Sequence, residues 1–196
     1  MNSSSDIGAR LNEVRTDISR ACADAGRSAD DVTLIVVTKF HPSSLVRELY
    51  ELGVRDVGEN RHQEAAEKSS ELADLDLTWH FIGRIQRNKA ARIGEWADVV
   101  HSVDRAELLE PLARAGRHPA VLIQVSLDGD LARGGVDPEG VPALADAVRA
   151  SGLPLRGVMG VAPLGADPRP GFERLVEIRD RLLADPPDAR WVSAGM

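Results

Sequence analysis

The chain has 196 residues, of which 43% are hydrophobic, and it carries a formal net charge of −7 at pH 7. Length and composition are those of one globular domain with a single buried core. The acidic balance argues against an electrostatic grip on nucleic acid or on an anionic membrane surface, so any bound anion must meet a local site. We therefore expect neither nucleic acid nor a membrane among the partners.

The cysteine content and the first residues bear on the compartment. The single cysteine, Cys22, excludes an internal disulfide and a cysteine-based zinc cluster. The N-terminal residues lack the apolar stretch of a secretory signal, and no later run approaches the roughly 18 apolar residues that a membrane helix needs. We expect a cytoplasmic protein.

Hydrophobic periodicity predicts a leading helix followed by alternating strands and helices. Apolar residues recur at helical spacing from Ile7 to Cys22, and Gly26 is a plausible stop. Strand-then-helix repeats imply right-handed βαβ units and a parallel sheet. The predicted strands are 32–37, 54–57, 77–82, 97–103, 120–127, 155–161 and 190–193. The predicted helices lie within 42–53, 61–75, 104–116, 138–152 and 170–186.

Two observations favour a barrel over an open sheet. The first strand is not followed by a glycine-rich nucleotide-binding motif. Polar or small residues stand in or just after the strands, where a parallel barrel gathers them at one mouth: Lys39, Asn60, His80, His101, Ser126, Gly160 and Ser193. A closed barrel needs eight strands, so we expect residues 1–196 to form one barrel domain that is incomplete at the C-terminus. A seven-unit sheet is the alternative.

Lys39 ends the first apolar run, and it is one of only three lysines, with Lys68 and Lys89. A neutral amine at a barrel mouth is a nucleophile, and its reaction with an aldehyde or ketone gives a Schiff base. The alternative is a lysine that extends into solvent or pairs with a carboxylate. Position alone does not decide between these roles.

Two further residues have both a structural and a functional interpretation. Asn60, with Gln63 three residues later, has the pattern of a helix N-cap, but its amide could equally face a ligand at the mouth. His80 lies within a strand, where a histidine is either a packing residue or a ligand-binding residue. The five histidines show no metal-ligand spacing, so we expect no metal site.

Several motifs together resemble one known family. The segments “VTKFHP”, “GENRHQE”, “WHFIGRIQRNK”, “HSVDR”, “LRGVMGVAP” and “VSAGM” occur in the order and spacing of the pyridoxal phosphate homeostasis protein family. The resemblance runs from about residue 30 to the last residue. It implies an α/β fold, a (β/α)8 TIM barrel of the alanine racemase N-terminal-domain type, with about seven strands in this chain and the leading helix.

The resemblance also implies a cofactor and a set of residues that bind it. The cofactor is pyridoxal 5′-phosphate (PLP), a form of vitamin B6, held as a Schiff base on Lys39. Motif positions that line the family's pocket correspond here to Asn60, His80, Met159 and Ser193. Ala194 stands where the family usually has methionine. The family's phosphate-binding segment follows the last motif, which is a further reason to expect an incomplete C-terminus.

The implied function is PLP homeostasis by a monomeric binding protein without established turnover, with PLP-dependent apo-enzymes as possible recipients. One alternative is a minimal PLP-dependent amino-acid racemase. The family lacks the second domain that gives racemases an opposing acid or base, and the only tyrosine, Tyr50, is expected to pack within a helix. Another alternative is a chain that acts through protein contacts at its exposed sheet edge.

Overall fold

A single sheet of seven strands organises the chain in the computed structural model, which describes residues 3–163, 165–182 and 189–195. The strands follow one another in chain order, and every neighbouring pair is parallel. They are β1 (Val36–Val37), β2 (Asp56–Glu59), β3 (Thr78–Phe81), β4 (Val99–Val103), β5 (Ala120–Gln124), β6 (Leu155–Val161) and β7 (Trp191–Gly195). The predicted parallel sheet and each of its seven strands are confirmed.

Helices precede the sheet and connect its strands. They are α1 (Ser3–Asp24), α2 (Ser43–Glu51), α3 (His62–Glu71), α4 (Ala90–Ile93), α5 (Leu109–Ala113), α6 (Val141–Ala150) and α7 (Pro168–Leu182). The leading helix and the five predicted connecting helices are confirmed, although residues 183–186 of the last one lie outside the described residues. Sequence periodicity missed α4 because a single turn is too short to show it. Among the described residues, no helix has the length and apolarity to cross a membrane.

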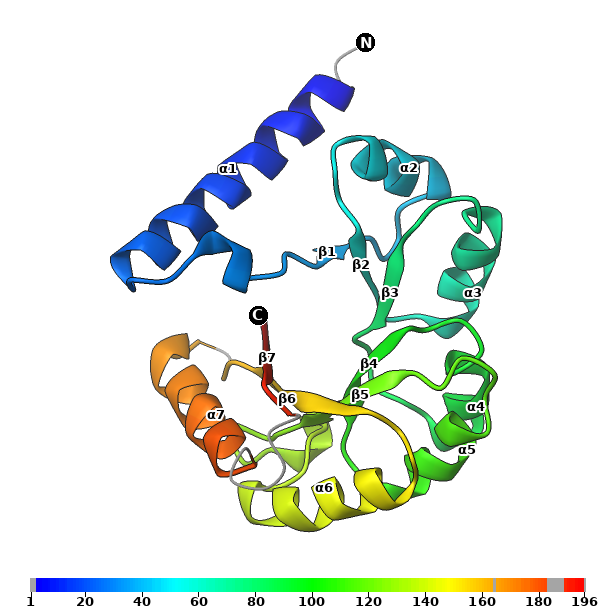
Figure 1. Cartoon of the computed structure of the whole chain (residues 1–196), viewed down its shortest axis with the longest axis vertical. Helices are drawn as coiled ribbons and strands as arrows, with labels where there is room; N and C mark the ends of the chain where they lie inside the picture. The colour runs from blue at the N-terminus through cyan, green and yellow to red at the C-terminus, as the bar shows by residue number, and fades with distance from the viewer. Residues whose placement is uncertain (1–2, 164, 183–188, 196) are drawn as a thin grey trace.

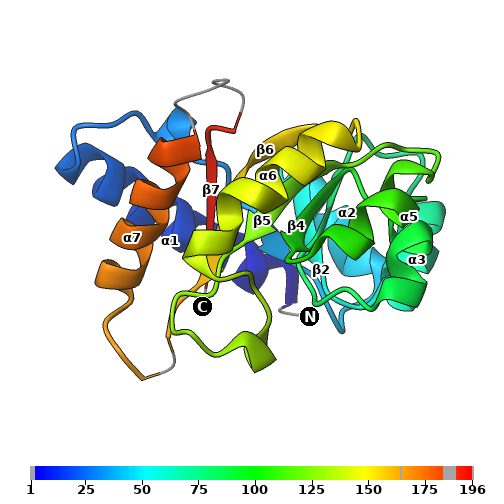
Figure 2. The ribbon, with the colours of Figure 1, turned by 90° about the horizontal axis from the view of Figure 1, so that it is seen from below.

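The sheet curls and carries the helices on its outside (Figure 1). In the described residues β1 and β7 each pair with only one neighbour, and an opening separates them, flanked by α1 and α7. Figure 2 shows the same arrangement from below, with α1 and α7 on one side of the molecule and α2, α3 and α5 on the other. The strands thus form a curled half-barrel, whose C-terminal strand ends all lie at one mouth.

Alternation along the strands divides the core into two parts. The large cluster, which includes Val100 and Ile123, packs between the sheet and the helices. A small cluster contains their chain neighbours Val99 and Leu122, together with Met159. Because successive strand residues point to opposite faces, the small cluster lies on the concave side of the sheet. This inner face is where side chains of different strands can meet.

The first strand is much shorter than the apolar run that predicted it. Val36 is opposite Val57 and Val37 is opposite Gly58, and the partner strand begins only at Asp56. Residues 32–34 therefore precede the region where β2 could pair with them. β1 has only two paired residues, and both pair with β2 alone. This pairing holds the segment after β1 weakly, so the position of Lys39 must depend on other contacts.

Gly157 marks the closest approach between β6 and β7. A Cβ atom built on this residue would lie 1.9 Å from the Trp191 carbonyl oxygen, and the residue has φ +152°. We predict that Gly157→Ala lowers the free energy of unfolding by about 2–3 kcal/mol, because β7 must move away from β6. Urea denaturation followed by circular dichroism measures this difference.

The matched control is Gly116→Ala, where nothing lies within 4 Å of the added methyl group. This substitution should change the free energy of unfolding by no more than about 1 kcal/mol. Equal stabilities of the two variants would contradict a close packing of β7 against β6.

Candidate functional site

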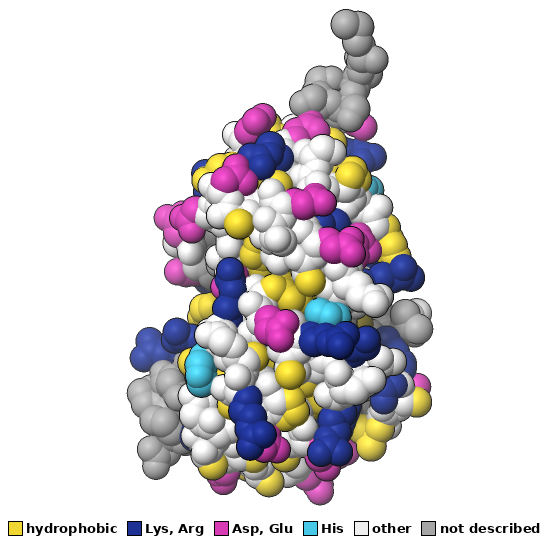
Figure 3. Space-filling view, turned by 90° about the vertical axis from the view of Figure 1, so that its right-hand side faces the viewer, with side chains coloured by type: hydrophobic (Ala, Val, Ile, Leu, Met, Phe, Trp, Pro, Cys, Tyr) yellow, Lys and Arg dark blue, Asp and Glu magenta, His cyan; other side chains and the backbone are white. Residues whose placement is uncertain are grey.

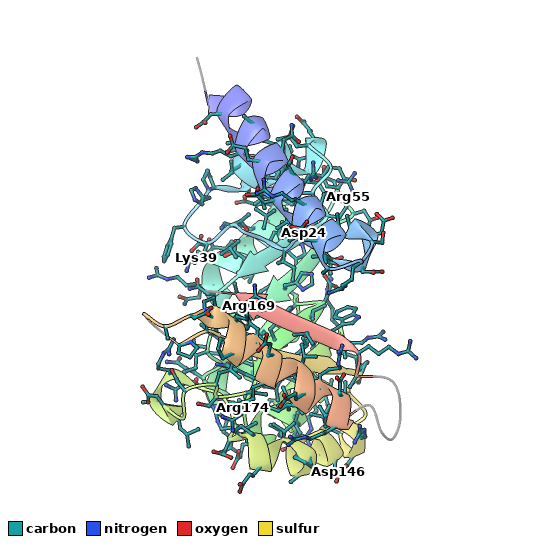
Figure 4. The ribbon with its side chains drawn as sticks, turned by 90° about the vertical axis from the view of Figure 1, so that its left-hand side faces the viewer. Asp24, Lys39, Arg55, Asp146, Arg169 and Arg174 are labelled. Atoms are coloured by element: carbon teal, nitrogen blue, oxygen red, sulfur yellow. The ribbon has the colours of Figure 1, made fainter. Side chains whose placement is uncertain are left out.

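Lys39 and Asn60 lie side by side at the mouth of the curled sheet. Val37 is opposite Gly58 in the β1–β2 ladder. Lys39 lies two residues beyond Val37, and Asn60 lies two residues beyond Gly58, so the two residues continue the same register. Figure 4 shows Lys39 beside the opening of the barrel. The sheet register therefore brings together two residues that are far apart in the sequence, as the predicted barrel requires.

The Lys39 amine is half-buried and has no carboxylate partner. Among the described residues, no acidic side chain lies within ion-pair distance of it. Its Nζ atom lies 5.9 Å from the centre of the Phe40 ring. Pairing of Lys39 with a carboxylate is therefore wrong within the described part of the chain, whereas extension of its amine into solvent stays an alternative.

A second lysine holds the end of β1 in place. Lys68, on α3, is 5% exposed. Its ammonium donates hydrogen bonds to the Thr38 carbonyl oxygen at 2.9 Å, to Glu59 Oε1 at 2.8 Å and to Glu64 Oε1 at 2.7 Å. The Thr38 hydroxyl also donates to Glu59 Oε1, at 2.8 Å. We refer to Thr38, Glu59, Glu64 and Lys68 as the strand-end network.

The strand-end network holds the backbone on both sides of Lys39. Thr38 is bound through its carbonyl oxygen, and the Phe40 N–H donates to Glu64 Oε1 at 2.7 Å. The hydrogen bond from Lys68 lowers the pKa of Glu64 and keeps this acceptor ionised. The spacing of Glu64 and Lys68 on one helix face was readable from the sequence, but their contact with β1 and β2 was not.

Asn60 does not act as a helix cap. Helix α3 begins at His62, its N-cap is Arg61, and no side chain accepts a capping hydrogen bond there. The cap interpretation was wrong because the helix starts one residue later than that pattern requires. The Asn60 Oδ1 atom is buried and has no hydrogen-bond partner among the described residues. A buried acceptor of this kind calls for a donor from a ligand or water.

Gly83 permits the tight packing of the loop after β3 against Asn60. A Cβ atom at this glycine would lie 2.4 Å from the Asn60 carbonyl oxygen. The glycine that follows β3 in the sequence is therefore explained by a close backbone approach. Its position fixes Asn60 from the side opposite Lys39.

His80 belongs to a chain of hydrogen bonds across the inner face of the sheet. Its Nε2 atom lies 3.0 Å from Asp56 Oδ1, and its Nδ1 atom lies 2.8 Å from His101 Nε2. The Nδ1 atom of His101 lies 2.8 Å from Ser193 Oγ. These four residues, from β2, β3, β4 and β7, form what we call the inner histidine chain. Sequence reasoning missed Asp56, and it placed His101 at the mouth without assigning it a role.

The hydrogen-bond partners set the direction of every bond in the inner histidine chain. A carboxylate accepts, so the His80 Nε2–H group donates to Asp56 and His80 Nδ1 accepts from His101 Nε2–H. The Ser193 hydroxyl then donates to His101 Nδ1, which leaves its oxygen lone pairs available to a bound group. Both ring nitrogens of His80 are occupied, so His80 can meet a ligand only through its ring surface.

Burial keeps both imidazoles uncharged. Burial lowers the pKa of His80, and the hydrogen bond that His80 donates to Asp56 opposes this effect only in part. Burial and the neighbouring His80 lower the pKa of His101 to about 3. The inner face of the barrel therefore presents two neutral histidines near neutral pH.

Met159 and Ser193 lie next to each other under the mouth. They are paired in the β6–β7 ladder, and Met159 is 6% exposed in the small inner cluster. Lys39 and Asn60 thus form one pair at the rim, while His80, Met159 and Ser193 form a floor within the sheet. No hydrogen bond joins rim and floor among the described residues.

Comparison with known proteins assigns the chain to a family. Residues 12–196 match the family model described as alanine racemase, N-terminal domain. The pyridoxal phosphate homeostasis protein of Mycobacterium tuberculosis is 40% identical, over 98% of this chain and 84% of its own length. The chain belongs to the pyridoxal phosphate homeostasis protein family. The resemblance drawn from the sequence motifs is confirmed.

Two solved structures confirm the family's fold for this chain. PipY of Synechococcus elongatus, with PLP bound, is 35% identical and matches with a TM-score of 0.72 over 91% of this chain and 87% of its own. A protein from Bifidobacterium adolescentis described as unknown is 28% identical and matches with a TM-score of 0.87 over 98% of this chain and 87% of its own. The barrel predicted from the sequence is thus the family's architecture.

The strand-end network yields a stability prediction. In Lys68→Met, the Glu59 carboxylate, which is 0% exposed, stays buried without its cation. The free energy of unfolding should fall by about 3–5 kcal/mol. Urea denaturation measures it. The control Lys89→Met removes a half-buried lysine without an ion pair among the described residues, and it should change stability by at most about 0.5 kcal/mol.

The inner histidine chain yields a pH prediction. The unfolded chain binds a proton at His101 below pH 6.5, whereas the folded chain does so only near pH 3. The free energy of unfolding should therefore fall as the pH drops through this window, by up to about 1.4 kcal/mol per pH unit from this residue. In His101→Gln this contribution disappears. Urea denaturation between pH 4 and 7 tests the slope.

Exposed His41 provides the control for this pH dependence. The variant His41→Gln should keep the full slope of stability against pH. A slope that is the same in His101→Gln and in the parent chain would contradict a neutral, buried His101.

Proposed function

We propose that this chain binds PLP, holds it as a Schiff base on Lys39, and acts in PLP homeostasis without catalytic turnover. The observation that carries the proposal is the half-buried Lys39 amine, which has no carboxylate partner in the described residues while the backbone on both sides of it is held by the strand-end network. The names of the relatives and the PLP-bound PipY structure support the choice of cofactor.

The residues around the mouth fit such a group. When bound, PLP supplies an aldehyde carbon, ring donors and acceptors, and a phosphate. The Lys39 amine adds to the aldehyde carbon, a C=N bond forms, and the aldehyde oxygen leaves as water; addition of water reverses the process. The unpaired Asn60 Oδ1 can accept a hydrogen bond from the bound group, and the Ser193 oxygen, which donates its proton to His101, can accept another.

The described residues near the floor offer no evident second acid or base for amino-acid chemistry. His80 and His101 are neutral and engaged in the inner histidine chain. Tyr50 lies in the last turn of α2, packs against the large core cluster, and has the Arg55 guanidinium 3.8 Å from its ring centre. The expectation that Tyr50 packs is confirmed. Without a positioned acid or base, proton transfer at an amino-acid α-carbon is poor, which favours a carrier that delivers PLP to apo-enzymes.

Borohydride trapping tests the cofactor site. The chain is incubated with PLP, reduced, and mapped by peptide mass spectrometry. We expect the label on Lys39, because Lys68 is buried with its three donors in use. The label should vanish in Lys39→Ala and persist in Lys89→Ala. A label that remains after Lys39→Ala would contradict the proposed site.

An optical assay separates the carrier from the minimal racemase. PLP-loaded protein is incubated with L-alanine or L-serine, and the enantiomers are separated by chiral chromatography. We expect no protein-dependent formation of the D-enantiomer. Time-dependent racemisation that is lost in Lys39→Ala would establish the enzyme instead.

A further inference from the structure

A second concave site lies on the outer side of the mouth, between the starts of α3 and α4. This basic cleft has a volume of about 700 Å³ and is bordered by the loops that follow β2, β3 and β4. Its cationic side chains are Arg61, Arg84, Lys89 and Arg105. Figure 3 looks on the face that carries α3, α4 and α5 and shows basic side chains beside a histidine there.

The charged side chains that line the basic cleft are all cationic. No acidic side chain belongs to it among the described residues. Arg105 is paired with Asp104 and donates to the Ile85 carbonyl oxygen at 2.9 Å, so it forms a fixed wall. Arg84 uses one N–H group on the Ala132 carbonyl oxygen, at 2.8 Å, and Lys89 has no ion pair in the described residues. These two cations are the ones free to meet an anion.

Helix α3 adds donors to the same cleft. It has ten residues, and no side chain caps its N-terminus at Arg61. The amides of its first turn therefore keep their donor capacity, and the positive end of the helix dipole favours an anion in front of it. Arg61 itself lies over the Phe40 ring, with 4.5 Å between the guanidinium carbon and the ring centre.

His62 adds a further hydrogen-bond donor to the lining of the basic cleft. The Trp96 indole N–H donates to His62 Nδ1 at 3.1 Å, so the neutral imidazole carries its proton on Nε2. Burial, together with the charges of Lys89 and Arg92, lowers the pKa of His62, so the ring stays neutral and is a donor through Nε2. Its partner Trp96 is buried and is a spectroscopic reporter for the cleft.

The floor of the cleft is apolar. Phe81, Ile85 and Ile93 belong to its lining, and all three are buried. A volume of about 700 Å³ is much larger than an inorganic anion and lies in the range of small-molecule sites. We propose that the basic cleft binds a small phosphate monoester with a flat organic part, the phosphate meeting Arg84, Lys89 and the start of α3. A polyanion is disfavoured by the net charge of −7.

The cleft shares Asn60 with the proposed PLP site, but none of its cations is Lys39, so this binding does not require the proposed Schiff base. The probe is phenyl phosphate, which has no aldehyde and cannot form an imine. Titration is followed by the indole N–H signals in a ¹H–¹⁵N correlation spectrum, assigned with Trp96→Phe. We expect the Trp96 signal to shift, and Trp191 on β7 to be unaffected.

Variants make the assignment specific. In the double variant Arg84→Ala/Lys89→Ala, phenyl phosphate should bind at least about tenfold more weakly, because two charge-assisted contacts are lost. Arg87→Ala, which removes an exposed cation in the turn between them, is the matched control and should keep the parent affinity. Lys39→Ala should also keep it.

The outcomes divide as follows. Loss of binding in the double variant alone supports the cleft. Equal affinity of the double variant and the parent, or no shift of the Trp96 signal, overturns the proposal. Loss of binding in Lys39→Ala would place the phosphate at the barrel mouth and would likewise overturn it. Inorganic phosphate should bind more weakly than phenyl phosphate, because it makes no contact with the apolar floor. Equal affinities would contradict a contribution of the ligand's organic part to binding.

Discussion

The buried Lys68 ammonium is the interaction on which the mouth of the barrel depends. β1 offers only two residues paired on one side, so the sheet alone holds the following segment weakly. Burial of a charge is costly unless every donor is satisfied, and here each of the three N–H groups has an oxygen acceptor. The ammonium thereby joins β1, β2 and α3. The position of Lys39 follows from this junction more than from the sheet itself.

The fold was predictable because its signals are local. Each strand is a short apolar run, and most helices show a repeating apolar stripe, so order and type could be read from the sequence. Lys39 was predictable as well, because the sequence alone shows a polar residue directly after an apolar run that forms a strand. Helix α4 was not, since four residues carry no period.

The site's internal contacts depend on register, which the sequence does not display. Asp56, His80, His101 and Ser193 meet only because four strands curl and align. The cap interpretation of Asn60 failed for a related reason: a shift of one residue in the helix start changes which side chain is the N-cap. The sequence therefore indicated which polar strand residues were candidates for the site, and the structure determined which of them are joined by hydrogen bonds.

The conformation of Phe40 has a kinetic consequence for the neighbouring lysine. Phe40 has φ +65°, a conformation that is uncommon for a residue with a side chain, and its N–H is bound to Glu64. With Thr38 also held, the backbone of Lys39 is fixed before any bond forms. Attachment of a carbonyl compound then immobilises only the lysine side chain, at an entropic cost of about 2 kcal/mol. Formation and hydrolysis of the proposed Schiff base would therefore need no rearrangement of the strand end.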